Sequence, residues 1–303
     1  MDILSLIKTH YYFENAAWSR EHEPIIETGT EKKKVYFWRD FNTLQWHINW
    51  RHRLYCDAFY VDRMLVTGSG QLFIPFESGG FLTCHDVLEE RADLEGNEKS
   101  WGQFIGTVLN RSMVPAKGYS QLLSQNIEKT YQTFEYMHRW QPQINSAEYQ
   151  MIKRCVPTVG ERIRKMKSLL RQNELEYVPY TTAFLPVERG KWLSGKLFWE
   201  IGQSTPVIGY RTFSDFLKKW LMATNEKSFY NLVETVDKIS PLNRHAHQLL
   251  ADLYFPDEWQ RMVDNLRFER QQILFEQFKT EWDATSRTTT FFYQFLKEQG
   301  YVL

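Results

Sequence analysis

Apolar residues follow two different periods along the chain, and the change between them divides the sequence. Up to about residue 90, short apolar runs are separated by turn residues, which is typical of strands. The predicted strands are residues 24–28, 34–39, 61–66, 71–76 and 81–88. One helix is predicted among them, over residues 41–59, because Trp46, Trp50 and Leu54 recur at every fourth position. The first part of the chain is therefore expected to be a sheet with one helix.

From Trp101 onward, apolar residues recur every three or four positions, which is typical of helices. The predicted helices are residues 101–113, 122–140, 146–170, 212–223, 228–238, 244–253, 257–278 and 289–299. Pro157 and Gly160 are expected to break or kink the third of these, because proline removes a helix hydrogen bond. This order of elements predicts an α+β protein with a strand-rich lobe, residues 1–90, and a helical lobe, residues 91–303.

One stretch interrupts the helical part with strand-like sequence. Residues 181–187 and 196–201 are short apolar runs, and Glu188, Arg189 and Gly190 lie between them as a polar turn. We therefore expect a β-hairpin in the middle of the helical lobe.

Composition and charge exclude several classes of partner. Lys plus Arg and Asp plus Glu both total 37, so no excess charge favours nucleic acid or an anionic membrane surface. No apolar run approaches the roughly 20 residues of a membrane helix, and the N-terminus lacks a signal-peptide pattern. Three widely spaced cysteines fit neither a disulfide framework nor a metal site. We expect a cytoplasmic protein with no membrane span and no nucleic-acid partner.

Aromatic residues make up 16% of the chain and include 11 tryptophans. Most are expected in the core, although Trp and Tyr are also favoured at protein interfaces. Trp46 and Trp50 share one helix face, which we expect to pack on the sheet. The alternative is that Trp46 and Trp50 bind a protein partner. The sequence leaves the partner and the oligomeric state open.

Two clusters of reactive residues have simple structural interpretations. Cys84, His85 and Asp86 are adjacent, but neighbouring residues of a strand point to opposite faces, so we expect no catalytic cluster there. His47 and Arg51 lie four apart on the predicted helix, where we expect them to pack beside tryptophan rings rather than line a cleft.

Two short motifs resemble kinase-like proteins. Residues 197–200, LFWE, resemble the (I/V)-D-W-E strand of aminoglycoside phosphotransferase-like kinases. Residues 249–259, LLADLYFPDEW, resemble an element late in the large lobe of spore-coat kinase-like proteins of the CotS and YutH type. The resemblance implies a bilobal protein-kinase-like fold, with a strand-rich small lobe and a mainly helical large lobe. It also implies association with the spore coat of an endospore-forming bacterium.

The same resemblance implies that the catalytic groups of these kinases are absent. The magnesium-binding aspartate of the family matches Phe198, and an aromatic ring cannot coordinate magnesium. The strand lysine that holds the nucleotide phosphates matches Trp38 or Arg39. Residues 41–56 contain no acid to pair with such a lysine, and residues 171–201 contain no His-x-Asp sequence for a catalytic loop.

Arg39, Phe198 and Glu200 are therefore expected to mark a degenerate kinase site, in which Glu200 keeps the family's glutamate. The sequence predicts no catalytic, cofactor-binding or metal-binding residue, and it favours a pseudokinase that binds protein partners in the cytoplasm or in the spore coat. Two alternatives stay open. The chain could be an active small-molecule phosphotransferase with displaced catalytic residues, or an unrelated two-domain interaction protein.

Overall fold

The computed structural model describes most of the chain. The described residues are 2–19, 24–29, 31–77, 79–117, 119, 128, 132, 146–171, 176–183, 185, 187–267 and 275–301. Of the predicted helix over residues 122–140, all but residues 128 and 132 lie outside them. The chain folds into two compact units, and each unit consists of two separate segments of the sequence. Unit 1 consists of Met1–Arg111 and Thr181–Val207, and unit 2 consists of Ser112–Tyr180 and Ile208–Leu303.

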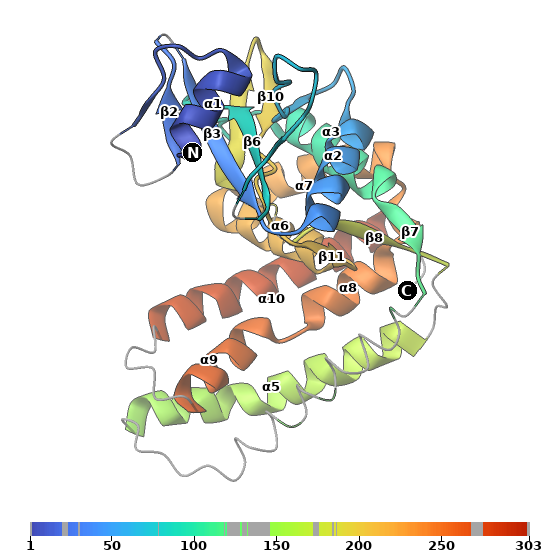
Figure 1. The fold of residues 1–303 in the computed structure, drawn as a ribbon. Helices are drawn as coiled ribbons and strands as arrows, with labels where there is room; N and C mark the ends of the chain where they lie inside the picture. Colours follow the sequence, from blue (N-terminus) through green and yellow to red (C-terminus); the bar gives the residue numbers. More distant parts are fainter. Residues whose placement is uncertain are drawn as a thin grey trace. The chain divides into compact units, whose positions relative to one another are not determined.

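Unit 1 is built on an antiparallel five-stranded sheet (Figure 1). Its strands, in spatial order, are β1 (Ala17–Trp18), β2 (Ile25–Glu27), β3 (Lys32–Trp38), β6 (Phe81–Asp86) and β5 (Ile74–Pro75). Alternation along β3 and β6 gives the sheet two different faces. Val35 and Cys84 pack against α1 (Ile3–Tyr11), whereas Tyr36 and Trp38 pack on the opposite face, with α2 (Phe41–Leu54).

Helix α2 begins directly after β3 because Asp40 caps it, with a carboxylate oxygen 2.7 Å from the backbone N–H of Thr43. Leu44 and Ile48 face the sheet and pack with Tyr36 and Trp38. The prediction that Trp46 and Trp50 face the sheet was wrong, because they lie two positions from Leu44 and Ile48, about 200° round the helix and so on nearly the opposite side. The helix ends at Leu54, earlier than predicted, and α3 (Glu98–Arg111) follows later in the same unit.

A second, three-stranded sheet in unit 1 contains the LFWE motif. It has the order β4 (Tyr60–Val61), β10 (Lys196–Trp199) and β9 (Gly190–Leu193). The predicted hairpin is present, but the predicted position of its turn was wrong. Strands β9 and β10 are joined through Ser194 and Gly195, with φ of 51° and 74°. Two successive residues with positive φ suit a tight hairpin, and glycine adopts this conformation without strain. The predicted turn at Glu188–Gly190 is instead a short 3-10 helix, η1 (Val187–Arg189), that leads into β9.

The other predicted hairpin strand is also reassigned. Strand β8 (Tyr177–Thr182) begins earlier than predicted and pairs with β7 (Met113–Pro115), in a three-stranded sheet of order β11-β8-β7 that includes β11 (Pro206–Ile208). Residue 185 has no strand assignment, and Val187 belongs to η1.

Unit 2 is mainly helical (Figure 1). Its helices, among the described residues, are α5 (Ser146–Arg171), α6 (Arg211–Ala223), α7 (Glu226–Ile239), η2 (Leu242–Arg244), α8 (Ala246–Tyr254), α9 (Asp257–Arg267) and α10 (Phe275–Glu298). Its core packs residues of α5 such as Val159 and Ile163 against Trp259 and Val263 of α9 and Phe278 of α10. The expected break in α5 is absent, since the helix runs through Pro157.

The last two predicted helices were divided at the wrong place. The segment predicted as one helix over residues 257–278 belongs to two helices, because α9 ends at Arg267 and Phe278 lies in α10. The separately predicted helix over residues 289–299 is the second half of α10. The predicted α+β class, with a strand-rich part and a helical part, is confirmed. No helix within the described ranges is both long and apolar enough to cross a membrane.

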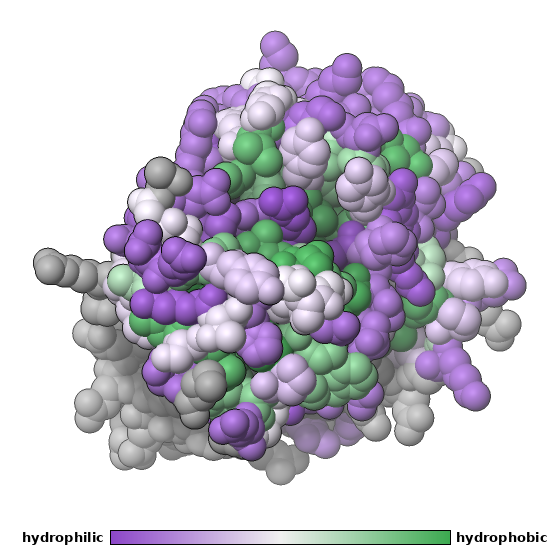
Figure 2. All heavy atoms as spheres, turned by 45° about the horizontal axis from the view of Figure 1, so that its top comes forward, coloured by the Kyte–Doolittle hydropathy of each residue, from purple (hydrophilic) through white to green (hydrophobic). Residues whose placement is uncertain are grey.

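The face of the molecule drawn in Figure 2 is mostly polar, with apolar side chains showing between the polar ones. This is the usual composition of a protein surface, where scattered apolar groups carry no special meaning.

Candidate functional site

The hairpin β9–β10 holds Phe198, the residue that the resemblance to aminoglycoside phosphotransferase-like kinases puts at the position of a metal-binding aspartate. Phe198 is 4% exposed, and its backbone pairs with Tyr60 of β4 and Lys191 of β9. The next residue, Trp199, turns to the other face of the strand and stacks on Phe104 of α3, with 4.7 Å between ring centroids. Both rings of the LFWE motif are therefore buried packing residues.

Glu200 follows directly after β10 and is half-buried. Burial raises the pKa of its carboxyl group above the ordinary value, although the positive charges of Lys34 and Lys191 oppose this. Its backbone N–H donates to the carbonyl of Arg189, which ties the end of the hairpin to η1. Glu200 is thus the acidic side chain of the motif in this chain, and it lies among basic side chains.

Trp38 and Arg39, which the resemblance puts at the position of the strand lysine, differ in their surroundings. Arg39 is exposed in the turn between β3 and α2. Trp38 is buried, and its indole N–H donates to the hydroxyl of Thr83, 2.8 Å away. The inward-facing side chain at the end of β3 is therefore an aromatic ring with no charge.

A buried polar network fills the space between the sheet and α2. Arg51 is its centre, with Nη2 2.8 Å from the Asp62 carboxylate, Nε 2.9 Å from the Asp62 carbonyl and Nη1 3.0 Å from Nδ1 of His47. Nη2 also donates to the carbonyl of Gly202 at 3.2 Å. The second carboxylate oxygen of Asp62 accepts the backbone N–H of Ile201 at 2.8 Å. The network therefore ties α2 to residues 201 and 202, directly after the LFWE motif.

His85 extends the network across the sheet. Its Nδ1 lies 3.1 Å from the Asp62 carboxylate, and its Nε2 lies 2.8 Å from the hydroxyl of Thr83. Because that hydroxyl already accepts the indole N–H of Trp38, its own proton is available to Nε2 of His85. We assign the single ring proton of His85 to Nδ1, which faces Asp62.

The same reasoning assigns the second histidine. Arg51 has only donors, so Nδ1 of His47 accepts from it, and the His47 proton lies on Nε2, 3.0 Å from the carbonyl of Ser204. Burial and the charge of Arg51 lower the pKa of His47 to about 3, and burial also lowers the pKa of His85 despite its contact with Asp62. Burial would raise the pKa of Asp62, but Arg51 and His85 outweigh it and lower it to about 2. The network is one arginine–aspartate ion pair flanked by two neutral histidines.

Asp86 follows His85 but points the other way, as strand alternation predicts. It makes ion pairs with Lys33 at 2.7 Å and with Arg63 at 2.8 Å. Cys84 is fully buried on the α1 side of the sheet, and burial raises the pKa of its thiol to about 12. A thiol with that pKa is protonated at neutral pH and is a poor nucleophile, so these three residues form no catalytic cluster.

Trp46 and Trp50 lie on the side of α2 that is turned away from Leu44 and Ile48, the residues that face the sheet. Their rings stack with 5.6 Å between centroids. Trp50 is 3% exposed and Trp46 is partly exposed, so Trp46 supplies nearly all the surface that this pair could offer to a partner. Binding of a partner by the pair stays a prediction.

A pocket of about 670 Å³ in unit 1 is lined by residues of both α2 and β10, and of the three predicted degenerate-site residues only Phe198 lines it. Phe198, from the metal position, and Arg51, from the helix after β3, both line it. The remaining wall is largely apolar and includes Ile48, Phe59 and Met64. Its volume falls within the range of about 300–1,000 Å³ typical of small-molecule sites.

Sequence reasoning did not identify Asp62, Thr83 or His85 as parts of one network. Only the spacing of His47 and Arg51 on the helix was a signal. Arg51 lies on the same helix face as Leu44 and Ile48, and this position could have indicated a buried partner for its charge, which sequence analysis did not predict. No group of three or more His, Cys, Asp or Glu residues that could hold a metal ion is present among the described residues.

Comparisons with known proteins give a fold but no sequence relative. No protein-family model matches the sequence, and no curated protein matches it. Among solved structures, an aminoglycoside phosphotransferase from Alicyclobacillus acidocaldarius subsp. acidocaldarius is similar with a TM-score of 0.75 and 10% identity, over 100% of this chain and 98% of that one. A spectinomycin phosphotransferase bound to ADP and spectinomycin has a TM-score of 0.56 and 10% identity, over 96% and 93% of the two chains.

An amicoumacin kinase, in a complex with AMP-PNP, calcium and Ami, is also similar, with a TM-score of 0.51 and 11% identity over 98% of this chain and 94% of that one. Identities this low establish architecture and leave activity open. The order of elements, the hairpin that carries the LFWE motif and these structural neighbours lead to one conclusion, that the chain has the aminoglycoside phosphotransferase-like fold, a kinase-like fold.

Proposed function

We propose that this protein is a pseudokinase, which keeps a kinase-like fold and acts by binding rather than by phosphoryl transfer. The observation that carries the proposal is the position of Phe198, a buried ring on β10 where the resemblance puts the magnesium-binding aspartate. A phenyl ring offers no oxygen ligand, and magnesium in kinase sites requires carboxylate and phosphate oxygens.

The buried network gives independent support. Active kinases pair a strand lysine with a helix glutamate, which leaves the lysine ammonium to hold the phosphates. Here α2 carries Arg51, whose guanidinium is bonded to Asp62, His47 and the carbonyl of Gly202. Its donors are directed at protein acceptors, so its role is to stabilise unit 1.

Nucleotide binding is the direct test. A ligand present at 100 times its dissociation constant stabilises the folded state by about 2.7 kcal/mol, which is a readily measured shift in melting temperature. We expect no magnesium-dependent shift with ATP, and the spectinomycin phosphotransferase, which has been crystallised with ADP, is the positive control for the assay. A magnesium-dependent shift for this chain would refute the pseudokinase proposal.

A second candidate is an active phosphotransferase with displaced groups, and Glu200 favours it. This carboxyl group lies one residue after β10, with Lys34 and Lys191 close enough to affect its pKa. If the chain transfers phosphate, we expect Glu200→Gln to abolish turnover of ATP, while Glu89→Gln, an exposed carboxylate of the same unit, leaves it unchanged. Absence of turnover in the parent protein excludes this candidate.

The proposed association with the spore coat rests on the resemblance of residues 249–259 alone. We expect a fluorescent fusion of the full chain, expressed in a sporulating endospore former, to concentrate around the forespore. The protein partner expected from the aromatic content is proposed to contact Trp46, and Trp46→Ala should then reduce its recovery with spore-coat extracts. Uniform fluorescence throughout sporulation would contradict the assignment to the coat.

A further inference from the structure

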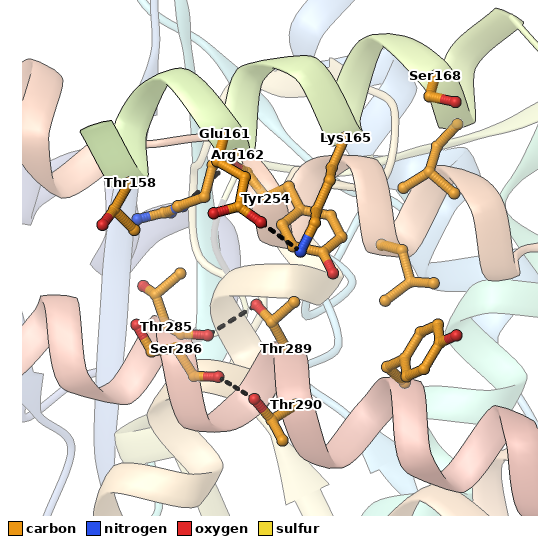
Figure 3. Close-up of a pocket in the computed structure, with 13 residues that line it drawn as sticks. Thr158, Glu161, Arg162, Lys165, Ser168, Tyr254, Thr285, Ser286, Thr289 and Thr290 are labelled. Atoms are coloured by element: carbon orange, nitrogen blue, oxygen red, sulfur yellow. Dashed lines mark hydrogen bonds and ion pairs between the residues drawn. The ribbon is translucent and has the colours of Figure 1, made fainter. Parts of the chain in front are cut away.

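Unit 2 contains a pocket that neither the kinase resemblance nor the proposed function uses. Its volume is about 640 Å³, and thirteen residues line it. Figure 3 shows α5 on one side and α10 on the other, with Tyr254 of α8 projecting into the space between them. Helix α8 packs against both α5 and α10, so the three helices form the pocket as a fixed part of the unit.

The lining of this pocket is rich in hydroxyl groups. Eight of the thirteen residues carry one: Thr158, Ser168, Tyr254, Thr285, Ser286, Thr289, Thr290 and Tyr293. Five of these, Thr285, Ser286, Thr289, Thr290 and Tyr293, lie on α10 at spacings of three or four residues, which bring side chains together on one face of a helix. Small hydroxyl side chains also leave room that larger residues would fill.

Three of the pocket hydroxyls on α10 donate their protons to backbone carbonyls of the same helix. Ser286 donates to the carbonyl of Trp282 at 3.0 Å, Thr289 to that of Thr285 at 2.7 Å, and Thr290 to that of Ser286 at 2.9 Å. A hydroxyl that donates its one proton keeps two lone pairs as acceptors. This wall of the pocket therefore offers acceptors, and it suits a ligand that has several O–H donors.

The charges in the pocket are compensated by protein groups. Lys165 lies 3.0 Å from Glu161, and this contact raises the pKa of the lysine, which keeps it charged. Arg162 lies 2.5 Å from the buried carboxylate of Glu258 and also donates to the carbonyls of Tyr254 and Phe255. Each cation thus has a carboxylate partner, so the pocket lacks the unbalanced positive charge that a phosphate group would need.

Two tyrosine rings complete the site. Tyr254 lies under Lys165, with the ammonium 5.5 Å from its ring centroid, and Tyr293 is 46% exposed at the pocket. An exposed ring next to a row of acceptors matches a molecule with an apolar C–H face and a rim of hydroxyls. We propose that this pocket binds a neutral saccharide of one or two rings.

The test uses the full chain and three probes, namely maltose, trehalose and inorganic phosphate, in isothermal titration calorimetry. We expect at least one of the two sugars to bind with a Kd of about 1 mM or tighter, and phosphate not to bind. Ser286→Trp, at an exposed position of the lining, should fill the pocket and weaken sugar binding at least tenfold.

A subtler variant and a matched control identify the chemistry. The double variant Ser286→Ala with Thr290→Val removes two exposed acceptors and should weaken sugar binding about tenfold. Thr280→Val removes a hydroxyl of the same helix that makes the same kind of bond, to the carbonyl of Glu276, but does not line the pocket, and it should leave binding unchanged. Circular dichroism melting of each variant confirms that it is folded.

Failure of both sugars to bind, equal binding by the parent and Ser286→Trp, or binding of phosphate in their place would overturn the proposal. These results are separable from the proposed function, because sugar binding without ATP-dependent stabilisation supports both proposals and ATP turnover refutes only the pseudokinase.

Discussion

Substitution of Asp62 by asparagine tests the buried network of unit 1 most directly. The carboxylate is 2% exposed, accepts hydrogen bonds from Arg51 and from the backbone N–H of Ile201, and lies 3.1 Å from Nδ1 of His85. Asparagine keeps the volume and one oxygen for Ile201. Its amide group, however, would place N–H donors against the guanidinium 2.8 Å away and against the protonated Nδ1 of His85.

The expected loss of stability follows from the charge that remains. A buried ion pair that loses one partner leaves an uncompensated charge, which costs about 3–5 kcal/mol. We expect Asp62→Asn to lower the free energy of unfolding by this amount in urea denaturation followed by tryptophan fluorescence. Glu89→Gln is the matched control, because Glu89 pairs with Lys32 at 2.8 Å but is 75% exposed, and exposed pairs contribute about 0–1 kcal/mol.

A double variant separates the charge from the packing. Arg51→Met with Asp62→Leu removes both charges and keeps apolar volume, so we expect it to recover most of the stability that Asp62→Asn loses. A free energy of unfolding for Asp62→Asn within about 1 kcal/mol of that of the parent protein would refute the reasoning. The guanidinium would then have found water or another acceptor.

Three further outcomes are expected. Phe198→Asp should be destabilised, and the pKa of its new carboxyl group should be raised, because the substitution buries a charge. It should not turn over ATP, because the substitution supplies no base or lysine. ATP turnover above that of the parent protein would show that these groups exist elsewhere. Pro157→Ala, at an exposed position inside α5, should raise the unfolding free energy by up to about 3 kcal/mol, and no change would mean that the helix is distorted there at no energetic cost. The pKa of His47 is lowered to about 3, so its stabilising effect is complete above about pH 6.5 and falls by roughly 1.4 kcal/mol per pH unit as the pH drops toward 3. His47→Gln should therefore flatten the dependence of the unfolding free energy on pH between 6.5 and 4.5. Equal slopes for the variant and the parent protein would contradict this.

Sequence reasoning predicted the fold because the element order depends on local periodicity, which is visible along the chain. It placed the hairpin turn wrongly, since Glu188, Arg189 and Gly190 form an attractive polar turn, whereas Ser194 and Gly195 adopt positive φ and connect the strands. Gly190 is required for a different reason, because a side chain there would lie 2.3 Å from the ring of Trp101.

The candidate site was harder to predict because its parts come together only in three dimensions. Asp62 and Ile201 are far apart in sequence, and their bond depends on β4 pairing with β10. No spacing rule along one segment links them. The pocket of unit 2 is similar, because its hydroxyl groups come from three helices that are ordinary in sequence.

Unit 1 consists of two segments that are separated in the sequence, and this has a consequence for its folding during synthesis on the ribosome. Its first segment ends at Arg111, but the acceptors of Arg51 and His47 at Gly202 and Ser204 belong to its second segment. Translation at about 5–20 residues per second delays those acceptors by roughly 5–20 s after Arg111 is made. During that interval the guanidinium of Arg51 and the imidazole of His47 lack their hydrogen bonds to Gly202 and Ser204. Residues 1–111 should therefore stay open to chaperones, and unit 1 should close only when the end of its second segment is synthesised.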